Sequence, residues 1–127
     1  MNNVSLWLLE KLLGEEGRQY ATVREYSAGE SVFRVGDQSD YLAVLLSGCV
    51  EIRKNQLLLS VVDPGSMFGE MGIIDRQPRI ADAYARNASR IAEIREGQFN
   101  ALLRGTPEFG LALMRLLTDR LRSRKES

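Results

Sequence analysis

The sequence predicts a mainly β fold with flanking helices, in which a small jelly-roll barrel lies between an N-terminal helix and C-terminal helices. Between Ala21 and Glu96, short runs rich in valine, isoleucine, leucine and tyrosine alternate with clusters of turn-forming residues. Evenly spaced short strands of this kind are typical of a small jelly-roll, or double-stranded β-helix, barrel. On either side of this region, apolar residues recur at helical spacing, which favours amphipathic helices.

The N-terminal segment, residues 5–13, is predicted to form an amphipathic helix, because Leu6, Leu9 and Leu13 fall on one face. Gly14 or Gly17 would end this helix. In the barrel region, turn-forming clusters separate the predicted strands and lie at residues 27–29, 35–40, 47–48, 54–56 and 63–66.

Two helices are predicted after a last strand at residues 91–94. The first spans residues 98–103 and is stopped by Gly105, and Thr106 then caps a final helix that has Pro107 at its first position. The final helix has an apolar stripe formed by Phe109, Leu113, Leu116, Leu117 and Leu121. We therefore expect one domain over residues 1–127, helical over 1–20, a β-barrel over 21–96 and helical over 97–125.

Composition limits the classes of protein to which the chain can belong. Its 127 residues are 44% hydrophobic and 27% charged, which suits a single domain with its own core. No apolar run is long enough for a membrane span and the N-terminus lacks a basic signal region, so we expect a cytoplasmic protein. The 17 basic and 17 acidic residues cancel, so net charge favours neither nucleic acid nor an anionic membrane. The one cysteine, Cys49, is interpreted as a buried structural thiol.

The absence of histidine argues against most metal sites and most enzymes. Metal-dependent cupins, zinc hydrolases and many oxygenases require several histidine ligands, and this chain has none. With one thiol and no imidazole, a general base or nucleophile would have to be a carboxylate, lysine or hydroxyl, and no pair stands out. We therefore expect a binding module with no catalytic residues and no metal.

The segment FGEMGIIDRQPRIADA has the residue types needed to hold one phosphate group. Gly69 permits close approach of the backbone to an anion, the N-terminus of a short helix offers unpaired N–H groups, and Arg79 offers two parallel hydrogen bonds. The Glu70 carboxylate would repel a phosphate but accepts hydrogen bonds from a neighbouring sugar hydroxyl. A ligand that carries both groups side by side is a nucleotide.

The strand predicted after this segment would direct Arg79 inward. At a period of two, Arg79 shares a face with three alanines, Ala81, Ala83 and Ala85. Small side chains beside an inward arginine would leave room for a ligand next to its guanidinium. The alternative is that Arg79 only caps a surface turn after Pro78, since most arginines are solvated.

The segment resembles the phosphate-binding cassette of the cyclic nucleotide-binding domains found in catabolite activator proteins, cAMP-dependent kinase regulatory subunits and cyclic nucleotide-gated channels. Further landmarks agree with the family's order: Ser27-Ala28-Gly29-Glu30, Gly36-Asp37, the strand at residues 41–46 closed by Ser47-Gly48, Val50-Glu51-Ile52 and Asp63-Pro64-Gly65. The resemblance covers nearly the whole chain. It implies a ligand site formed by Phe68, Gly69, Glu70, Met71, Arg79, Ile80 and Ala81.

The same resemblance implies that the final helix acts as a lid over the purine. Arg120 would pair with Glu70 when the lid closes, Leu121 would cover the base and Arg124 would stack on it. The other basic residues of this helix end, Arg115, Arg122 and Lys125, are interpreted as a solvated cluster that complements the helix dipole.

Residue Ile80 departs from the family pattern, in which threonine, serine or alanine often follows the cassette arginine. The hydroxyl is associated with recognition of cGMP, so its loss favours cAMP, with cGMP as the alternative ligand. Isoleucine is also bulky and would crowd the base or phosphate if it pointed at them, in which case binding is weak or lost.

Three hypotheses follow from the sequence. The first is a sensor or regulatory domain for a cyclic nucleotide, most of all cAMP, that signals through its C-terminal helix. The second is a degenerate barrel that serves as a protein-interaction domain without nucleotide, and the third is a nucleotide-dependent enzyme. Expected partners are the cyclic nucleotide, an effector protein or fused effector domain, and a second copy through the C-terminal helix. DNA binding by this chain alone is not expected, because no recognition helix follows.

Overall fold

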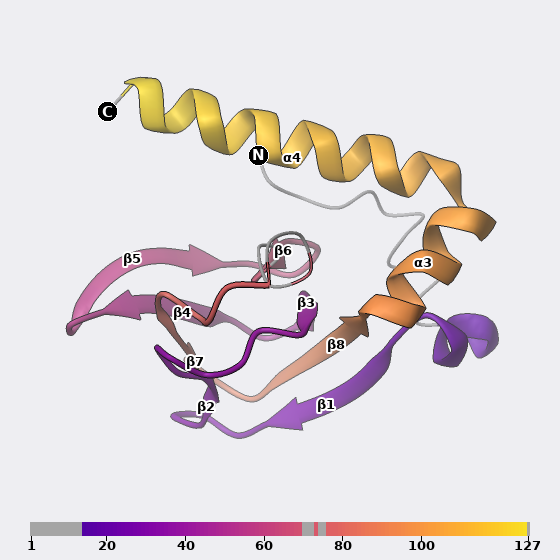
Figure 1. The fold of residues 1–127 in the computed structure, drawn as a ribbon. Coiled ribbons are helices and arrows are strands. Elements are labelled where there is room, and N and C mark those ends of the chain that lie inside the picture. The colour runs from indigo at the N-terminus through magenta and orange to yellow at the C-terminus, as the bar shows by residue number, and fades with distance from the viewer. Residues whose placement is uncertain (1–13, 70–72, 74–75, 127) are drawn as a thin grey trace.

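Two four-stranded antiparallel sheets face one another in a β-sandwich, and two helices follow the last strand (Figure 1). The computed structural model of the protein describes residues 14–69, 73 and 76–126, apart from the side chains of residues 15, 16, 120 and 123–126. The predicted mainly β fold with C-terminal helices is confirmed. The helix predicted over residues 5–13 lies outside the described residues, which begin just before a short 3-10 helix, η1 (Glu15–Gln19).

The first sheet has the strand order β1-β8-β3-β6. Its strands are β1 (Thr22–Tyr26), β8 (Ser89–Arg95), β3 (Tyr41–Ser47) and β6 (Met67–Phe68). Strand β8 pairs with β1 on one side and with β3 on the other, so Glu93 lies opposite both Thr22 and Ala43. The two central strands are therefore the most buried part of this sheet.

The second sheet has the order β2-β7-β4-β5. Its strands are β2 (Ser31–Phe33), β7 (Asp82–Ala85), β4 (Val50–Lys54) and β5 (Leu57–Val62). Strands β4 and β5 form a hairpin in which Asn55 and Gln56 have positive φ angles of 52° and 69°. Positive φ at both central residues is the geometry of a tight hairpin turn, at the place where the sequence predicts one.

Strand β3 separates two apolar cores. Its residues Tyr41, Ala43 and Leu45 face the other sheet and pack with residues such as Phe33 and Val50. The alternate residues Leu42 and Val44 face the helices and pack with Leu102 and Phe109. A strand that is covered on both faces reads as a continuous apolar run, which explains the sequence YLAVLL.

Helix α3 (Glu96–Gly105) is longer than the predicted helix over residues 98–103. Its first turn is stabilised by the side-chain oxygen of Gln98, which accepts a hydrogen bond from the backbone N–H of Arg95 at 3.1 Å. Helix α4 (Pro107–Glu126) begins at the predicted proline. Thr106 precedes α4 as predicted, but its side chain does not cap the helix. Within the described structure its buried hydroxyl has no hydrogen-bond partner, and its backbone carbonyl accepts a hydrogen bond from the N–H of Phe109.

Only the first part of the predicted α4 stripe is packed against the domain. Phe109, Leu113 and Leu116 are buried in the core shared with α3 and β8, and Leu117 packs at its edge. Leu121 is 60% exposed, so it lies outside both cores. The buried part of the stripe therefore ends before Leu121, in the later turns of α4, which run on from α3 above the sandwich (Figure 1).

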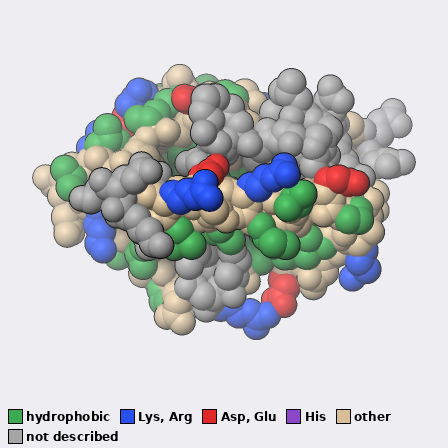
Figure 2. All heavy atoms as spheres, turned by 90° about the horizontal axis from the view of Figure 1, so that it is seen from above, with side chains coloured by type: hydrophobic (Ala, Val, Ile, Leu, Met, Phe, Trp, Pro, Cys, Tyr) green, Lys and Arg blue, Asp and Glu red, His purple; other side chains and the backbone are tan. Residues whose placement is uncertain are grey.

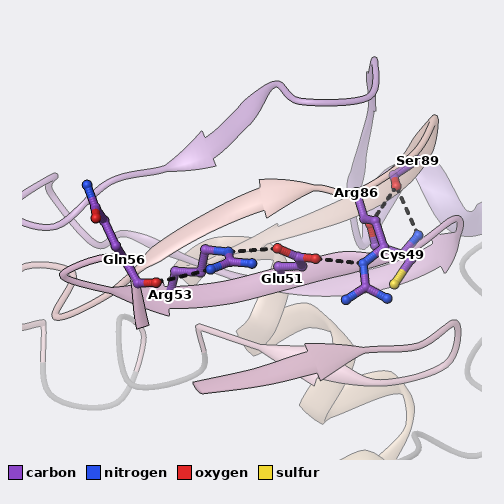
Figure 3. A network of polar contacts seen from close by, with 6 residues as sticks. All are labelled: Cys49, Glu51, Arg53, Gln56, Arg86 and Ser89. Carbon is purple, nitrogen blue, oxygen red and sulfur yellow. Dashed lines mark hydrogen bonds and ion pairs between the residues drawn. The ribbon is translucent and has the colours of Figure 1, made fainter. Parts of the chain in front are cut away.

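A network of ion pairs connects β4 with the strand end that follows β7 (Figure 3). The Glu51 carboxylate accepts from Arg53 at 2.7 Å and from Arg86 at 2.6 Å. These two hydrogen bonds lower the pKa of Glu51, with that from Arg86 the larger cause. Beside them, the Ser89 hydroxyl accepts from the backbone N–H of Cys49 at 3.1 Å. This network joins β4 to the residue that follows β7.

Candidate functional site

Burial alternates from Arg79 to Ala85 as the sequence predicts, but the strand itself, β7, begins only at Asp82. Arg79 is only 6% exposed, and Ala81, Ala83 and Ala85 are buried on the same side. Ile80, between them, is 67% exposed. Arg79 therefore points into the domain and does not merely cap a surface turn after Pro78.

The backbone of Arg79 is fixed by the turn that precedes β3. Its N–H donates to the carbonyl of Asp37 at 2.9 Å, and its carbonyl accepts from the N–H of Gly36 at 2.8 Å. Gly36 has a φ of +88°, which allows this close antiparallel contact. The Gly36-Asp37 landmark noted in the sequence thus has a structural task, since it anchors the arginine at the edge of the sandwich.

The guanidinium of Arg79 has partners on most sides. Its Nη1 donates to the carbonyl of Gly69 at 2.8 Å and its Nη2 to the carbonyl of Tyr41 at 2.7 Å. The Phe33 and Tyr41 ring centroids lie 4.1 Å and 4.8 Å from its central carbon. Burial lowers the pKa of Arg79, while the nearby Tyr41, Asp40 and Asp37 oppose that shift.

One polar atom of this guanidinium is left over. The Nε of Arg79 is buried and has no hydrogen-bond partner among the described residues. An unsatisfied buried donor costs about 1–3 kcal/mol, and it is unusual in a native fold. A positively charged donor in this state has the chemistry of a site for an anion.

Gly69 is the second fixed point of the site. It has a φ of +70°, and a Cβ atom at this position would collide with Nη1 of Arg79. The sequence predicts that Gly69 allows close approach to an anion, whereas in this structure the group it admits is the arginine itself. Both observations require a residue without a side chain.

The remaining predicted site residues fall into two groups. Phe68 and Ala81 are buried near Arg79, with Phe68 in the core between the sheets. Glu70 and Met71 lie outside the described residues. On α4, the side chains of Arg120 and Arg124 are not described either, and Leu121 is exposed. The contacts that the family resemblance implies for these residues stay predictions.

Sequence reasoning missed a buried carboxylate beside this site. Glu93 is 3% exposed and receives ion pairs from Arg24 at 2.9 Å and from Arg95 at 3.2 Å. The hydroxyl of Tyr26 lies 3.5 Å from the same carboxylate. The signal in the sequence is that Glu93 shares a strand face with the apolar Ile91, so an inward charge could have been noticed there.

No other constellation of described residues suggests chemistry of this kind. Groups of three or more histidine, cysteine, aspartate or glutamate side chains that could hold a metal ion do not occur among residues that the structure describes. In the same part of the chain, no helix has both the length and the apolar character to cross a membrane.

The comparisons with known proteins agree with this geometry. Residues 23–106 match the family model described as "Cyclic nucleotide-binding domain", so the chain belongs to the cyclic nucleotide-binding domain family. It is 30% identical over 103 residues to a CRP-like cAMP-activated global transcriptional regulator of Mycobacterium tuberculosis, with 77% of this chain and 46% of the relative covered. It is also similar to glutaminase 2 of Bradyrhizobium diazoefficiens, at 35% identity over 98 residues, with 76% of this chain and 16% of that enzyme covered.

Among solved structures, the catabolite activator protein of Thermus thermophilus superimposes with a TM-score of 0.79 at 29% identity. The match covers 92% of this chain and 59% of the Thermus chain. The matches therefore cover between 16% and 59% of the lengths of the three relatives named here. Domains of this family occur in both gene regulators and enzymes.

Proposed function

We propose that this domain is a cyclic nucleotide sensor that binds cAMP in preference to cGMP. The observation that carries the proposal is the buried Arg79 guanidinium, whose Nε has no partner within the described structure. A phosphodiester anion would satisfy this donor and neutralise its charge. Phe68, Gly69, Met71 and Ala81 would line the same site, with Glu70 on the ribose hydroxyl.

The preference for cAMP rests on Ile80. Its side chain is 67% exposed beside the arginine, and it has no hydroxyl to offer to a guanine amino group. The Mycobacterium tuberculosis relative is named as cAMP-activated, which supports the same preference. The exposed position also means that Ile80 does not occupy the interior face on which Arg79 lies.

The output of the sensor would leave through α4. In the bound state Arg120, Leu121 and Arg124 would close over the purine, and α4 would present the change to an effector protein or a fused effector domain. Leu111 and Met114 are exposed three residues apart on α4 and offer a seam for a second copy. Figure 2 views the domain from above Figure 1 and shows hydrophobic side chains among charged ones on that side. We further propose a cytoplasmic location, no catalysis by the domain itself and no DNA contact from these residues.

A second candidate function is a protein-interaction domain without nucleotide. Strand β5 is at the edge of its sheet, and Leu57 and Leu59 are 65% and 52% exposed there. An edge strand with exposed apolar residues is a ready surface for another protein.

Isothermal titration calorimetry with cAMP and cGMP tests the proposal. Wild type should bind cAMP, and Arg79→Ala should lose about 2–5 kcal/mol, or about 30-fold to several thousandfold in affinity, since a buried charge-assisted pair is removed. Arg90→Ala, which removes an exposed arginine of β8, is the matched control and should bind as wild type does. Failure of wild type to bind either nucleotide would favour the interaction domain.

A further inference from the structure

Glu93 is an unusual residue to find inside this sandwich. It shares the inward face of β8 with Ile91, and its neighbour across the ladder on β3 is the small, fully buried Ala43. A buried carboxylate costs several kcal/mol unless it is paired. Glu93 is paired on two sides, by Arg24 from β1 and by Arg95 from its own strand.

Arg95 carries this pairing toward the phosphate-type site. Its Nη2 lies 3.2 Å from the Glu93 carboxylate and its Nη1 lies 2.9 Å from the Asp40 carboxylate. The same guanidinium lies over the Tyr41 ring, 5.4 Å from the centroid, because Tyr41 and Arg95 are opposite each other in the β3–β8 ladder. Two carboxylates thus hold one cation against one face of the sandwich.

Tyr41 completes the connection. Its ring lies near both guanidinium groups, that of Arg95 and that of Arg79 at 4.8 Å, and its carbonyl accepts from Arg79. Burial, and next the Glu93 charge, raise the pKa of Tyr41 to about 12, so the phenol stays neutral near pH 7. A neutral aromatic ring close to two cations attracts both of them.

We propose that Glu93 is a positioning residue for Arg79, acting through Arg95 and the Tyr41 ring. The ion pair fixes Arg95, Arg95 fixes the ring, and the ring with its carbonyl fixes the guanidinium that would meet the phosphate. This inference deepens the proposed nucleotide site and rests on it for its functional meaning. It assigns a role to a buried carboxylate in a domain that is proposed to bind an anion.

The direction in which neutralising Glu93 changes the affinity for an anion distinguishes a positioning role from a purely electrostatic effect. If Glu93 acted only through space, its neutralisation would raise the positive potential around Arg79 and strengthen the binding of an anion. If Glu93 positions Arg79, neutralisation loosens the guanidinium and weakens binding. Glu93→Gln keeps the size of the side chain and removes the charge, so it distinguishes the two.

The first measurement needs no ligand. In the ligand-free protein, the Nε–Hε group of Arg79 is observed by ¹⁵N NMR and assigned by its loss in Arg79→Lys, and its exchange with solvent is measured. Glu93→Gln and Arg95→Gln should each speed this exchange at least about fivefold, since the buried group opens more often. Arg24→Gln is the matched control, because it removes the other partner of Glu93 but leaves the pair with Arg95, and it should leave the exchange rate within about twofold. If Arg95→Gln leaves the exchange rate of the Arg79 Nε–Hε group unchanged, the proposal is wrong. Arg95 is exposed, so this variant should fold and can decide the question even if Glu93→Gln does not fold.

The second measurement is a double-mutant cycle on cAMP affinity. Glu93→Gln should weaken binding about tenfold in the wild-type background and have no effect in Arg79→Ala, as expected for residues that act as one unit. Tighter binding, or an equal loss in both backgrounds, overturns the positioning role. If wild type binds no nucleotide, the proposed function fails, whereas the exchange measurement still decides whether Glu93 positions Arg79.

Discussion

The carbonyl oxygen of Gly69 accepts a hydrogen bond from Nη1 of Arg79 at 2.8 Å, so the two ends of the phosphate-type segment are joined before any ligand is present. The contact joins a glycine at φ +70° to a buried arginine ten residues further along the chain. The residues between them include Glu70 and Met71, which are predicted to touch the ligand. The Gly69–Arg79 contact thus fixes the positions of the two residues that bound this stretch of the chain.

Gly69→Ala should damage both stability and ligand binding. The positive φ costs an alanine about 1–2 kcal/mol, and its Cβ would push against the Arg79 guanidinium. Denaturant unfolding should show the lost stability, and calorimetry a weaker affinity for cAMP. Gly97→Ala in α3 is the control: its Cβ meets nothing within 4 Å, and it should keep the affinity and raise stability by about 0.5–1 kcal/mol. A Gly69→Ala protein as stable as wild type would show that a side chain at position 69 causes no strain.

Ile80→Thr should narrow the preference for cAMP over cGMP. A polar contact that one ligand makes and the other lacks is worth about 1–3 kcal/mol, so wild type should prefer cAMP by about tenfold or more. The added hydroxyl restores a partner for guanine, and competition binding with both nucleotides measures the change. Ile80→Val, which trims the side chain without a hydroxyl, is the control. A wild-type protein that prefers cGMP would refute the role of Ile80.

The distal part of α4 should become more protected from hydrogen exchange when cAMP binds. Leu113 and Leu116 are already buried against the domain, whereas Leu121 is exposed, so the change should be concentrated between residues 118 and 124. Exchange of backbone amides measured by mass spectrometry, with and without saturating cAMP, is the test. Equal protection in both states would mean that α4 is not a lid.

The Glu51 network should stabilise the fold in a pH-dependent way. Its hydrogen bonds lower the pKa of Glu51 in the folded state, so its contribution is present above the unfolded pKa of about 4.3 and is lost as pH falls through the lower, folded value. The difference in free energy of unfolding between wild type and Glu51→Gln should therefore be constant from about pH 6 to 7 and shrink below about pH 4. Denaturant titrations across this range measure it. A difference that is independent of pH would show that the carboxylate charge contributes nothing.

Much of this site was accessible from sequence because it depends on local periodicity. A period of two correctly placed Arg79 inside with the alanines up to Ala85, although β7 begins only at Asp82 and Arg79 itself is held by contacts with Gly36 and Asp37. The hairpin at Asn55 and Gln56 likewise follows from turn chemistry. In each case the deciding information lies within a few neighbouring residues.

Two of the contacts that sequence reasoning missed depend on register between distant strands. Tyr41 meets Arg95 only because β3 and β8 pair in one particular register, and Glu93 meets Arg24 only because β1 lies beside β8. The exposed Leu121 could not be predicted from its stripe either, since helical spacing does not say how far along a helix the packing extends. Spacing along one segment contains none of this information.

Strand β3 is buried on both faces from Tyr41 to Leu45, and this has a mechanical consequence. Tyr41 holds the arginine on one face, while its neighbour Leu42 lies against Leu102 and Phe109 on the other. Because a close-packed interior transmits strain, a displacement of Tyr41 should also shift the surface of β3 against which α3 and α4 pack. Tyr41, which contacts the arginine that would bind a phosphate, is thus adjacent in the chain to Leu42, which packs against the helices that would transmit the signal.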